Sequence, residues 1–196
     1  MIPMPQPRSR GTMSVEAALA RRRSVREFRA EPLALDDVAQ ILWAGQGVTH
    51  ADGHRTAPSA GGLYPLELYV LAGGVAGLDT GVYQYDPEAH ALAAVAIGDA
   101  REAVARAALD QRWVAEAPAV LVFAAVLGRT TGKYGERGVR YVHVEVGHAA
   151  QNVYLQAEAL GLGTTIVGAF RDAELTRLLG LGAGVAPLAI MPIGRA

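Results

Sequence analysis

The chain has 196 residues, which is enough for one domain with a full hydrophobic core and short for two. Its formal net charge at pH 7 is −1, so no overall positive field indicates a nucleic-acid partner. The lack of cysteine excludes disulfides, thiolate nucleophiles and Cys-ligated metals. The longest uncharged apolar runs, 118–128 and 182–194, are shorter than the roughly 20 residues of a membrane span. We therefore expect a cytoplasmic protein that binds neither nucleic acid nor membrane.

The N-terminal segment predicts a flexible tail followed by a single domain. Residues 1–13 carry proline, arginine and serine but no apolar stretch of a secretory signal, so the domain is expected over 14–196. Ser14 is a suitable N-cap for a first helix that runs to about Arg22. A second helix is expected from about Leu35 until glycines end it.

The end of the first helix carries an unusual density of positive charge. Four arginines and a hydroxyl fall within six residues: Arg21, Arg22, Arg23, Ser24 and Arg26. Guanidinium groups match phosphate oxygens two hydrogen bonds at a time, so the stretch indicates a phosphomonoester site. A solvated basic helix end explains the same residues, because cations are favourable at a helix C-terminus. The stretch alone leaves both interpretations open.

A long irregular segment, 50–65, precedes a predicted strand over 66–72. Its prolines and the adjacent pair Gly61 and Gly62 prevent regular structure. Small side chains let the backbone approach a flat ligand closely, and Ser59 adds a hydroxyl. Long loops of this kind are usually either functional or disordered, and the strand that follows directly argues against disorder.

The middle of the chain reads as mixed helix and strand. Residues 81–86 and 91–97 predict a hairpin. Asp99 with Glu102 forms a capping box that opens a helix to about Trp113.

The second half contains the most apolar elements. Residues 118–127 are continuously apolar and predict a strand buried on both faces. A glycine-punctuated loop is expected over 128–138, then a long helix over 139–160 with an apolar face.

The remaining residues predict a short strand within 161–170, a helix from Asp172 to about Leu179 and a final strand over 187–193. The elements do not alternate strictly, so a doubly wound fold is not expected. No Gly-x-Gly-x-x-Gly follows a strand, which argues against a Rossmann dinucleotide site.

Four stretches occur together in a fixed order and carry a family resemblance. They are Arg-Arg-Ser-x-Arg-x-Phe at 22–28, Pro-Ser-Ala-Gly-Gly at 58–62 with Pro65, Gly-His-Ala-Ala-Gln-Asn at 147–152 running into Gly-Leu-Gly at 161–163, and Pro-Ile-Gly-Arg at 192–195. Together they resemble the FMN-dependent nitroreductase superfamily. Within it, the chain is most similar to the SagB-type dehydrogenases, which include the azoline oxidases of ribosomal-peptide biosynthesis. The similarity extends over residues 14–195.

The resemblance implies an α+β fold with three α/β/α layers and a mixed, mostly antiparallel sheet. It also implies a homodimer with two FMN sites at the interface. The implied FMN-binding residues are Arg22, Arg23, Ser24 and Arg26 at the phosphate and nearby ring oxygens; Pro58, Ser59, Ala60 and Gly62 from the partner subunit; the backbone N–H groups of Val167 and Gly168 near flavin N5 and O4; and Arg195 reaching back to the phosphate.

The resemblance further implies an FMN-dependent oxidoreductase that moves hydride through flavin N5. Because no separate dinucleotide motif is present, donor and acceptor are expected to share one pocket in a ping-pong cycle. The substrate would be a small molecule or a peptide-derived heterocycle, with NAD(P)H as a possible donor. Two alternatives remain open, an NAD(P)H-dependent nitro- or quinone reductase and a flavin-binding partner subunit without turnover of its own.

One lysine stands out among the basic residues. Of the 18 lysines and arginines, Lys133 is the single lysine, and Tyr134 follows it. The pair resembles the Lys-Tyr base of the azoline oxidases, which implies a catalytic role. The competing interpretation leaves Lys133 exposed on a loop and packs Tyr134 on the sheet edge. No metal site is expected, because the histidines at 143 and 148 match no zinc spacing.

Overall fold

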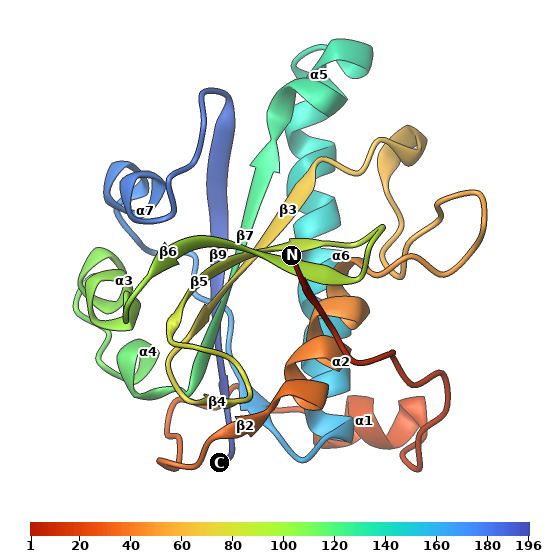
Figure 1. Cartoon of the computed structure of the whole chain (residues 1–196). Coiled ribbons are helices and arrows are strands. Elements are labelled where there is room, and N and C mark those ends of the chain that lie inside the picture. The colour runs from red at the N-terminus through yellow and green to blue at the C-terminus, as the bar shows by residue number, and fades with distance from the viewer.

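The computed structural model describes all residues, 1–196, and has a seven-stranded sheet at its centre (Figure 1). Every strand pairing in this sheet is antiparallel. Its strands, in spatial order, are β1 (Ile2–Pro3), β6 (Ala91–Ile97), β5 (Gly81–Asp86), β3 (Leu66–Ala72), β7 (Ala119–Val126), β9 (Val185–Gly194) and β8 (Gly163–Thr164). A separate parallel pair joins β2 (Leu33–Ala34) to β4 (Val75–Ala76). The predicted mostly antiparallel arrangement is confirmed, with the parallel pairing of strands outside the central sheet.

Helices cover both faces of the sheet, which gives the three layers expected (Figure 1). One face carries α1 (Val15–Arg21), α2 (Leu35–Gln46) and the long α6 (Arg137–Ala159); the other carries α3 (Arg101–Ala107), α4 (Trp113–Glu116) and α7 (Asp172–Leu178). Helix α5 (Leu127–Tyr134) continues directly from β7 and packs on α6. No helix is both long enough and apolar enough to cross a membrane.

The hydrophobic core is divided by the sheet. Neighbouring residues of β7 point to opposite faces, so Phe123 packs in the cluster beneath α2 and α6 while Val122 packs beneath α3 and α7. The first cluster has 30 buried residues and the second 14, so the α2–α6 side holds most of the core. This burial on both faces explains why β7 is a continuous apolar run rather than an alternating one.

Several predicted elements are confirmed. The first helix begins where expected, and the Ser14 hydroxyl accepts a hydrogen bond from the Ala17 N–H at 3.2 Å. The hairpin of β5 and β6, the buried strand β7 and the long helix α6 also match the predicted ranges closely. These elements have strong periodicity or continuous apolar runs, which are the most reliable local signals.

The predicted loop over 128–138 was wrong, because α5 occupies most of it. Gly128 and Gly132 lower its helix propensity, but packing against α6 outweighs that cost. At Gly138 an added Cβ would lie 2.8 Å from the backbone of Thr130 and Thr131, so α5 and α6 are in very close contact.

Two other predictions need correction, the single helix from Asp99 to about Trp113 and the flexible N-terminal tail. The helix expected from Asp99 to Trp113 divides into α3 and α4, because Leu109 and Asp110 adopt positive φ values of 59° and 60°. The predicted capping box of Asp99 and Glu102 does not form: the N-cap of α3 is Ala100, which makes no side-chain cap hydrogen bond, and Asp99 accepts from the Arg101 N–H and binds its guanidinium.

The first residues, expected to be a flexible tail, make defined contacts instead. Ile2 and Pro3 pair with β6, and Met4 is buried at 5% exposure. The backbone of Arg8 exchanges two hydrogen bonds with the side chain of Gln40 on α2. These contacts attach residues 2–8 to the domain.

Candidate active site

The segment after α1 lies directly against β8. Ser24 forms a parallel bridge with Thr164, and the Val25 N–H donates to the Thr164 carbonyl at 3.0 Å. A Cβ added at Gly163 would lie 2.7 Å from the Val25 side chain, so the close approach requires glycine at this position. The basic stretch is therefore fixed to the sheet edge and does not extend freely into solvent.

Tyr154 of α6 gathers the polar groups of this segment. The Arg22 guanidinium lies 5.1 Å from the centre of the Tyr154 ring, and the Ser24 and Tyr154 hydroxyls are 3.4 Å apart. The same tyrosine hydroxyl accepts a hydrogen bond from the Ile166 N–H at 2.8 Å. Arg22, Ser24 and the segment that leads to Val167 therefore meet at one side chain.

Sequence reasoning missed Tyr154, although a signal was present. Tyr154 follows Val153 and precedes Ala157 on the buried side of α6, and a tyrosine hydroxyl among apolar neighbours needs a polar partner.

The other predicted phosphate ligands have different partners. The Arg23 guanidinium donates to the last carbonyls of α1, which matches the basic helix-end interpretation. Arg26 lies 5.7 Å from the Trp113 ring. Arg195 lies 3.7 Å from Glu31 and 3.8 Å from Asp37, so a contact with phosphate would require those ion pairs to break.

Val167 and Gly168 differ in what their backbone can offer a ligand. The Val167 N–H donates to the Ile190 carbonyl of β9 at 2.8 Å and is already engaged. A Cβ added at Gly168 would meet nothing within 4 Å, so this residue borders open space. Of the two predicted flavin donors, Gly168 is therefore the available one.

The 58–62 loop is shaped by Gly61 and Gly62, whose φ values are +66° and +65°. The Ser59 hydroxyl donates to Glu145 Oε2 at 2.5 Å and accepts from the Tyr64 N–H at 2.9 Å. Asn152 of the third motif donates to the carbonyl of Thr56 just before the loop. The Gly62 N–H donates to the Ser59 carbonyl at 3.1 Å, and Pro58 and Gly62 are exposed.

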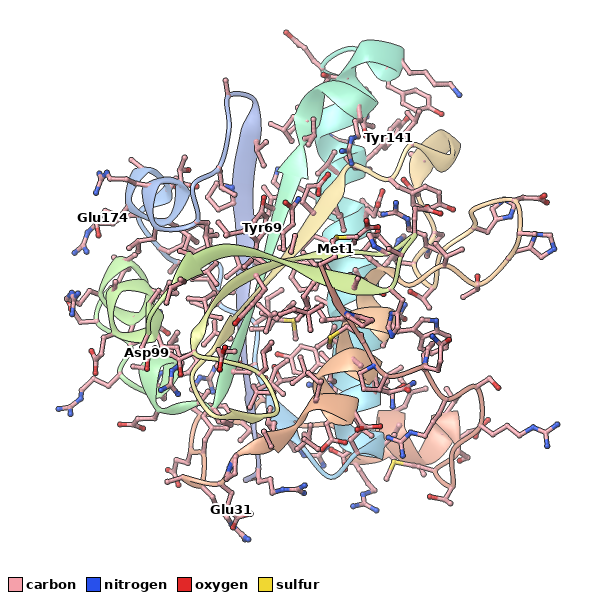
Figure 2. The ribbon with its side chains drawn as sticks, viewed as in Figure 1. Met1, Glu31, Tyr69, Asp99, Tyr141 and Glu174 are labelled. Atoms are coloured by element: carbon pink, nitrogen blue, oxygen red, sulfur yellow. The ribbon has the colours of Figure 1, made fainter.

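Lys133 and Tyr134 reach this loop from α5. A Cβ at Gly61 would lie 2.7 Å from Tyr134 Oη and 3.0 Å from Lys133 Nζ, so the glycine leaves room for both polar atoms. Lys133 is exposed, and its ammonium lies 5.4 Å from the Tyr134 ring. Tyr134 contacts the Tyr141 ring edge-on at 5.1 Å rather than the sheet edge, and Figure 2 labels Tyr141 at the α5 end of α6.

A buried polar network supports the loop from below. Glu145 is 2% exposed and Gln46 is 1% exposed, while Arg55 donates to Gln46 Oε1 at 3.0 Å and lies over the Tyr64 ring at 4.7 Å. Burial raises the pKa of the Glu145 carboxyl to about 7, although the Ser59 hydrogen bond and the Arg55 charge act to lower it.

This network was also missed in the sequence. Glu145 falls between Val142 and Ala149 on the apolar face of α6, so a carboxylate in that position was a visible signal of a specific buried partner.

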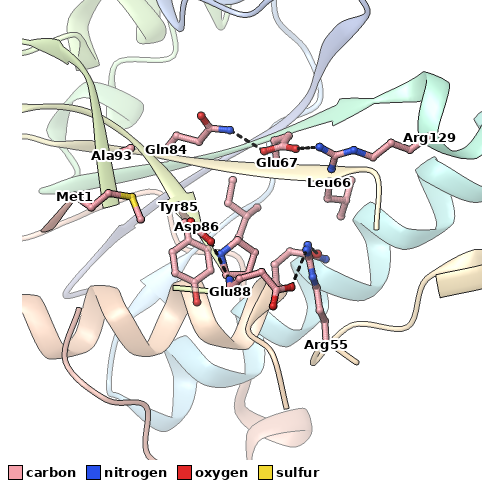
Figure 3. Close-up of a pocket in the computed structure, with 13 residues that line it drawn as sticks. Met1, Arg55, Leu66, Glu67, Gln84, Tyr85, Asp86, Glu88, Ala93 and Arg129 are labelled. Carbon is pink, nitrogen blue, oxygen red and sulfur yellow. Dashed lines mark hydrogen bonds and ion pairs between the residues drawn. The ribbon is translucent and has the colours of Figure 1, made fainter. Parts of the chain in front are cut away.

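Two cavities lie near the loop, and Arg55 lines both of them. One of about 370 Å³ is lined by His54, Arg55, Thr56, Pro58, Ser59, Gly62 and Tyr64. The other, of about 340 Å³, lies between β3 and the β5–β6 hairpin (Figure 3). Figure 3 shows Glu67 held between Gln84 and Arg129 in its wall, with Arg55 facing Glu88 across the opening at 3.9 Å.

The tip of the preceding loop carries His50, Asp52 and His54, whose potential ligand atoms lie within 4.8 Å of one another. All three side chains are exposed. Exposed groups of this kind do not by themselves define a metal site.

Two polar groups thus attach to α6 at different levels. Glu145 holds the 58–62 loop, and Tyr154 holds Arg22 and Ser24 nine residues later in the sequence. At about 1.5 Å per residue, the two attachment points are roughly 14 Å apart along the helix axis.

The sheet order, the layers and the long central helix define an α+β oxidoreductase fold of the nitroreductase type. The chain belongs to the nitroreductase family, whose model matches residues 19–195. A protein of Methanocaldococcus jannaschii assigned by name to the nitroreductases is 49% identical over 183 residues, covering 93% of this chain and 91% of that protein. The Escherichia coli microcin B17-processing protein McbC is 28% identical over 146 residues, which is 71% of this chain and 54% of McbC.

Solved structures confirm the fold. A protein of Ralstonia eutropha named as a nitroreductase has a TM-score of 0.87 and 32% identity, covering all of this chain and 89% of its own. A chain of the E. coli microcin synthetase McbBCD complex with truncated pro-MccB17 has a TM-score of 0.79 and 25% identity, with 98% and 76% covered. The Vibrio harveyi NADPH:FMN oxidoreductase complexed with NAD⁺ has a TM-score of 0.66 and 25% identity, with 92% and 68% covered.

Proposed function

We propose that this protein is an FMN-dependent oxidoreductase that transfers hydride through flavin N5 in a ping-pong cycle. The observation that carries the proposal is the meeting of Arg22, Ser24 and the Ile166 N–H at Tyr154, two residues before the open backbone of Gly168. A permanent cation, a hydroxyl and an accessible N–H are the groups that a flavin phosphate and ring edge require. Membership of the nitroreductase family supports the same cofactor.

The residues present fit a bound FMN. Arg22 and Ser24 would hold the phosphate, and Arg26 would join them by leaving Trp113. The Thr164 hydroxyl, next to Ser24, is buried without a hydrogen-bond partner, and such groups are usually satisfied by water or a ligand. FMN would supply the two-electron hydride chemistry that amino-acid side chains cannot.

We further propose that the active protein is a homodimer in which each flavin contacts two chains. The separation of roughly 14 Å along α6 supports this arrangement, because the Arg22 cluster and the 58–62 loop lie at different levels of one chain. Pro58, Ala60 and Gly62 would line the flavin ring of the partner's site. The Gly168 N–H would hydrogen-bond the ring edge.

Bound flavin and its reduction test the proposal directly. The purified protein is expected to be yellow or to become so with added FMN, and Arg22→Ala is expected to weaken FMN binding at least tenfold, the loss of about one charge-assisted contact. Arg140→Ala, an exposed arginine on α6, serves as the matched control. Protein that takes up no FMN would refute the proposal.

The electron donor distinguishes the candidate activities. Anaerobic bleaching by NADH or NADPH would favour a reductase, as the name of the Vibrio harveyi neighbour suggests for that protein. Flavin that neither nucleotide bleaches would favour a dehydrogenase or a flavin-binding partner subunit. Initial rates that require a ternary complex would exclude the ping-pong cycle.

A second candidate within this function is a SagB-type dehydrogenation of an azoline ring. The approach of Lys133 and Tyr134 to Gly61 favours it, because a base must lie beside the ring-lining loop to remove a proton while hydride leaves. Similarity to McbC supports the substrate class. Lys133→Ala is expected to slow oxidation of a model thiazoline at least 100-fold. Unchanged turnover would exclude Lys133 as the base.

A further inference from the structure

The Ser59 hydroxyl has no spare donor in this structure. A serine hydroxyl has one proton and two acceptor positions. Its proton is directed to Glu145 Oε2 at 2.5 Å, a length typical of a bond to a carboxylate, and it accepts from the Tyr64 N–H at 2.9 Å. As long as Glu145 is ionised, Ser59 points into the protein and offers no donor to a ligand on the loop.

The surroundings of Glu145 favour proton uptake by its carboxylate near neutral pH. It lies buried on α6, and its Oε1 has no hydrogen-bond partner, so the carboxylate is only half satisfied. A buried ionised group with a vacant acceptor is costly, which favours proton uptake near neutral pH. The raised pKa of about 7 agrees with this environment.

One cation, the Arg55 guanidinium from the 50–65 segment, acts to lower the pKa of Glu145. From α2, the neutral Gln46 holds Arg55 in place. From α5, Lys133 and Tyr134 reach Gly61, two residues beyond Ser59. The sheet beneath α6 contributes apolar side chains to this core.

We propose that Glu145 is a positioning residue whose protonation state sets the direction of the Ser59 hydroxyl and so the donors that the 58–62 loop presents to the flavin. When Glu145 is ionised, Ser59 donates inward to Oε2. When a proton binds at Oε2, the carboxyl donates to Ser59 Oγ instead. Ser59 then accepts two hydrogen bonds, and its own proton turns to the open side of the loop.

The proposal rests on the proposed FMN site, and it predicts a direction for cofactor binding. Protonated Glu145 gives the loop one more donor that can face the flavin. FMN affinity should therefore rise about tenfold as pH falls from about 8 to about 6, the size of one hydrogen bond. Glu145→Gln, which is neutral at every pH, should show little of this dependence. Ser59→Ala should also lose it.

The experiment measures the FMN dissociation constant and the visible spectrum of bound FMN across this pH range. Glu136→Gln is the control, because Glu136 is an exposed glutamate at the start of the same helix. It should keep the wild-type dependence. Equal pH dependence in the wild type and the Glu145→Gln variant would overturn the proposal.

A second measurement separates this proposal from failure of the FMN site. In the apoprotein, a double-mutant cycle of Glu145→Gln and Ser59→Ala on urea unfolding should give a coupling that is larger above pH 7 than below pH 6. If the apoprotein shows this coupling but binds no FMN, the proposed cofactor and the loop's role toward it are refuted. The carboxylate–hydroxyl switch itself would still stand. Absent or pH-independent coupling would refute the switch itself.

Discussion

Among single residues, Tyr154 has the widest influence on the candidate site. Its ring lies under Arg22, and its hydroxyl contacts Ser24 and the Ile166 N–H. Arg22 and Ser24 come from the segment after α1, whereas Ile166 comes from the segment after β8. One side chain of α6 thus fixes two segments that are distant in the sequence.

Tyr154→Phe tests this role, because it removes the hydroxyl and keeps the ring beneath Arg22. The Ile166 N–H would lose its acceptor, so the free energy of unfolding should fall by about 1–2 kcal/mol. FMN binding should weaken as well, since Ser24 and the 166–168 segment would be less well fixed. Urea unfolding and FMN titration measure the two effects. Unchanged values for both would show that the hydroxyl does not organise the site.

Glu145 provides a prediction of stability against pH. The pKa of its carboxyl is raised from 4.5 to about 7 in the folded protein, chiefly by burial. The folded state therefore keeps a proton that the unfolded chain loses, so this stability is present below pH 4.5 and is lost as pH rises through about 7.

In the Glu145→Gln variant the side chain stays neutral over this whole pH range. Relative to the wild type, the variant should gain stability as pH rises, by roughly 3 kcal/mol between about pH 4.5 and pH 8. Urea unfolding of both proteins over this range measures the difference, with Glu136→Gln as control. A constant difference across the range would contradict the buried titration.

The sequence predicted the chemistry of the site residues better than their contacts. Arg22 and Arg23 are identical neighbours, yet one faces Tyr154 and the other the carbonyls of α1. Only the backbone path after α1 determines this difference, and no local pattern reveals it. Arg195 likewise pairs with Glu31 and Asp37, which become its neighbours only in the folded chain.

At the scale of secondary structure, the contact between α5 and α6 brings Lys133 and Tyr134 to the 58–62 loop. Gly138 allows it, because an added Cβ would lie 2.8 Å from the backbone of α5. Periodicity predicted α6 correctly, but α5 was predicted as a loop. Its two glycines lower the helix propensity of a short helix that tertiary packing stabilises.

Gly138→Ala should therefore destabilise the protein by about 1–3 kcal/mol, because backbone on both sides of the clash has to move. Lys133 should also be displaced from the loop, with a corresponding loss of any Lys133-dependent turnover. Gly132→Ala is the control: it lies in α5, and its added Cβ meets nothing within 4 Å. Equal thermal stability of the two variants would contradict the close packing.

At the scale of the whole molecule, each chain carries two groups of proposed site residues, the Arg22 cluster and the 58–62 loop, at different heights along α6. Exposed apolar side chains accompany them: Val15 is 63% exposed, Leu19 53%, Val144 51% and Ile166 42%. Apolar side chains exposed on the elements that carry the site support an interface there. The fold could be predicted from the four motifs in order, but the assembly depends on surface shape and remains our proposal.

Val144→Asp tests the assembly, because it places a charge on the exposed side of α6 without altering the buried core. We expect the variant to sediment as a monomer and to bind FMN at least tenfold more weakly than the wild type, since burying an unpaired charge costs more than about 1.4 kcal/mol. Glu136→Gln should remain dimeric. A monomeric wild type that binds FMN fully would contradict a shared site.

The most direct test of the central claim is an equilibrium titration of the apoprotein with FMN, followed by the change in flavin absorbance. We expect one FMN per chain, with affinity that falls at least tenfold in Arg22→Ala and is unchanged in Arg140→Ala. A wild-type protein that binds no FMN, or an Arg22→Ala variant that binds it as tightly as the wild type, would contradict the account.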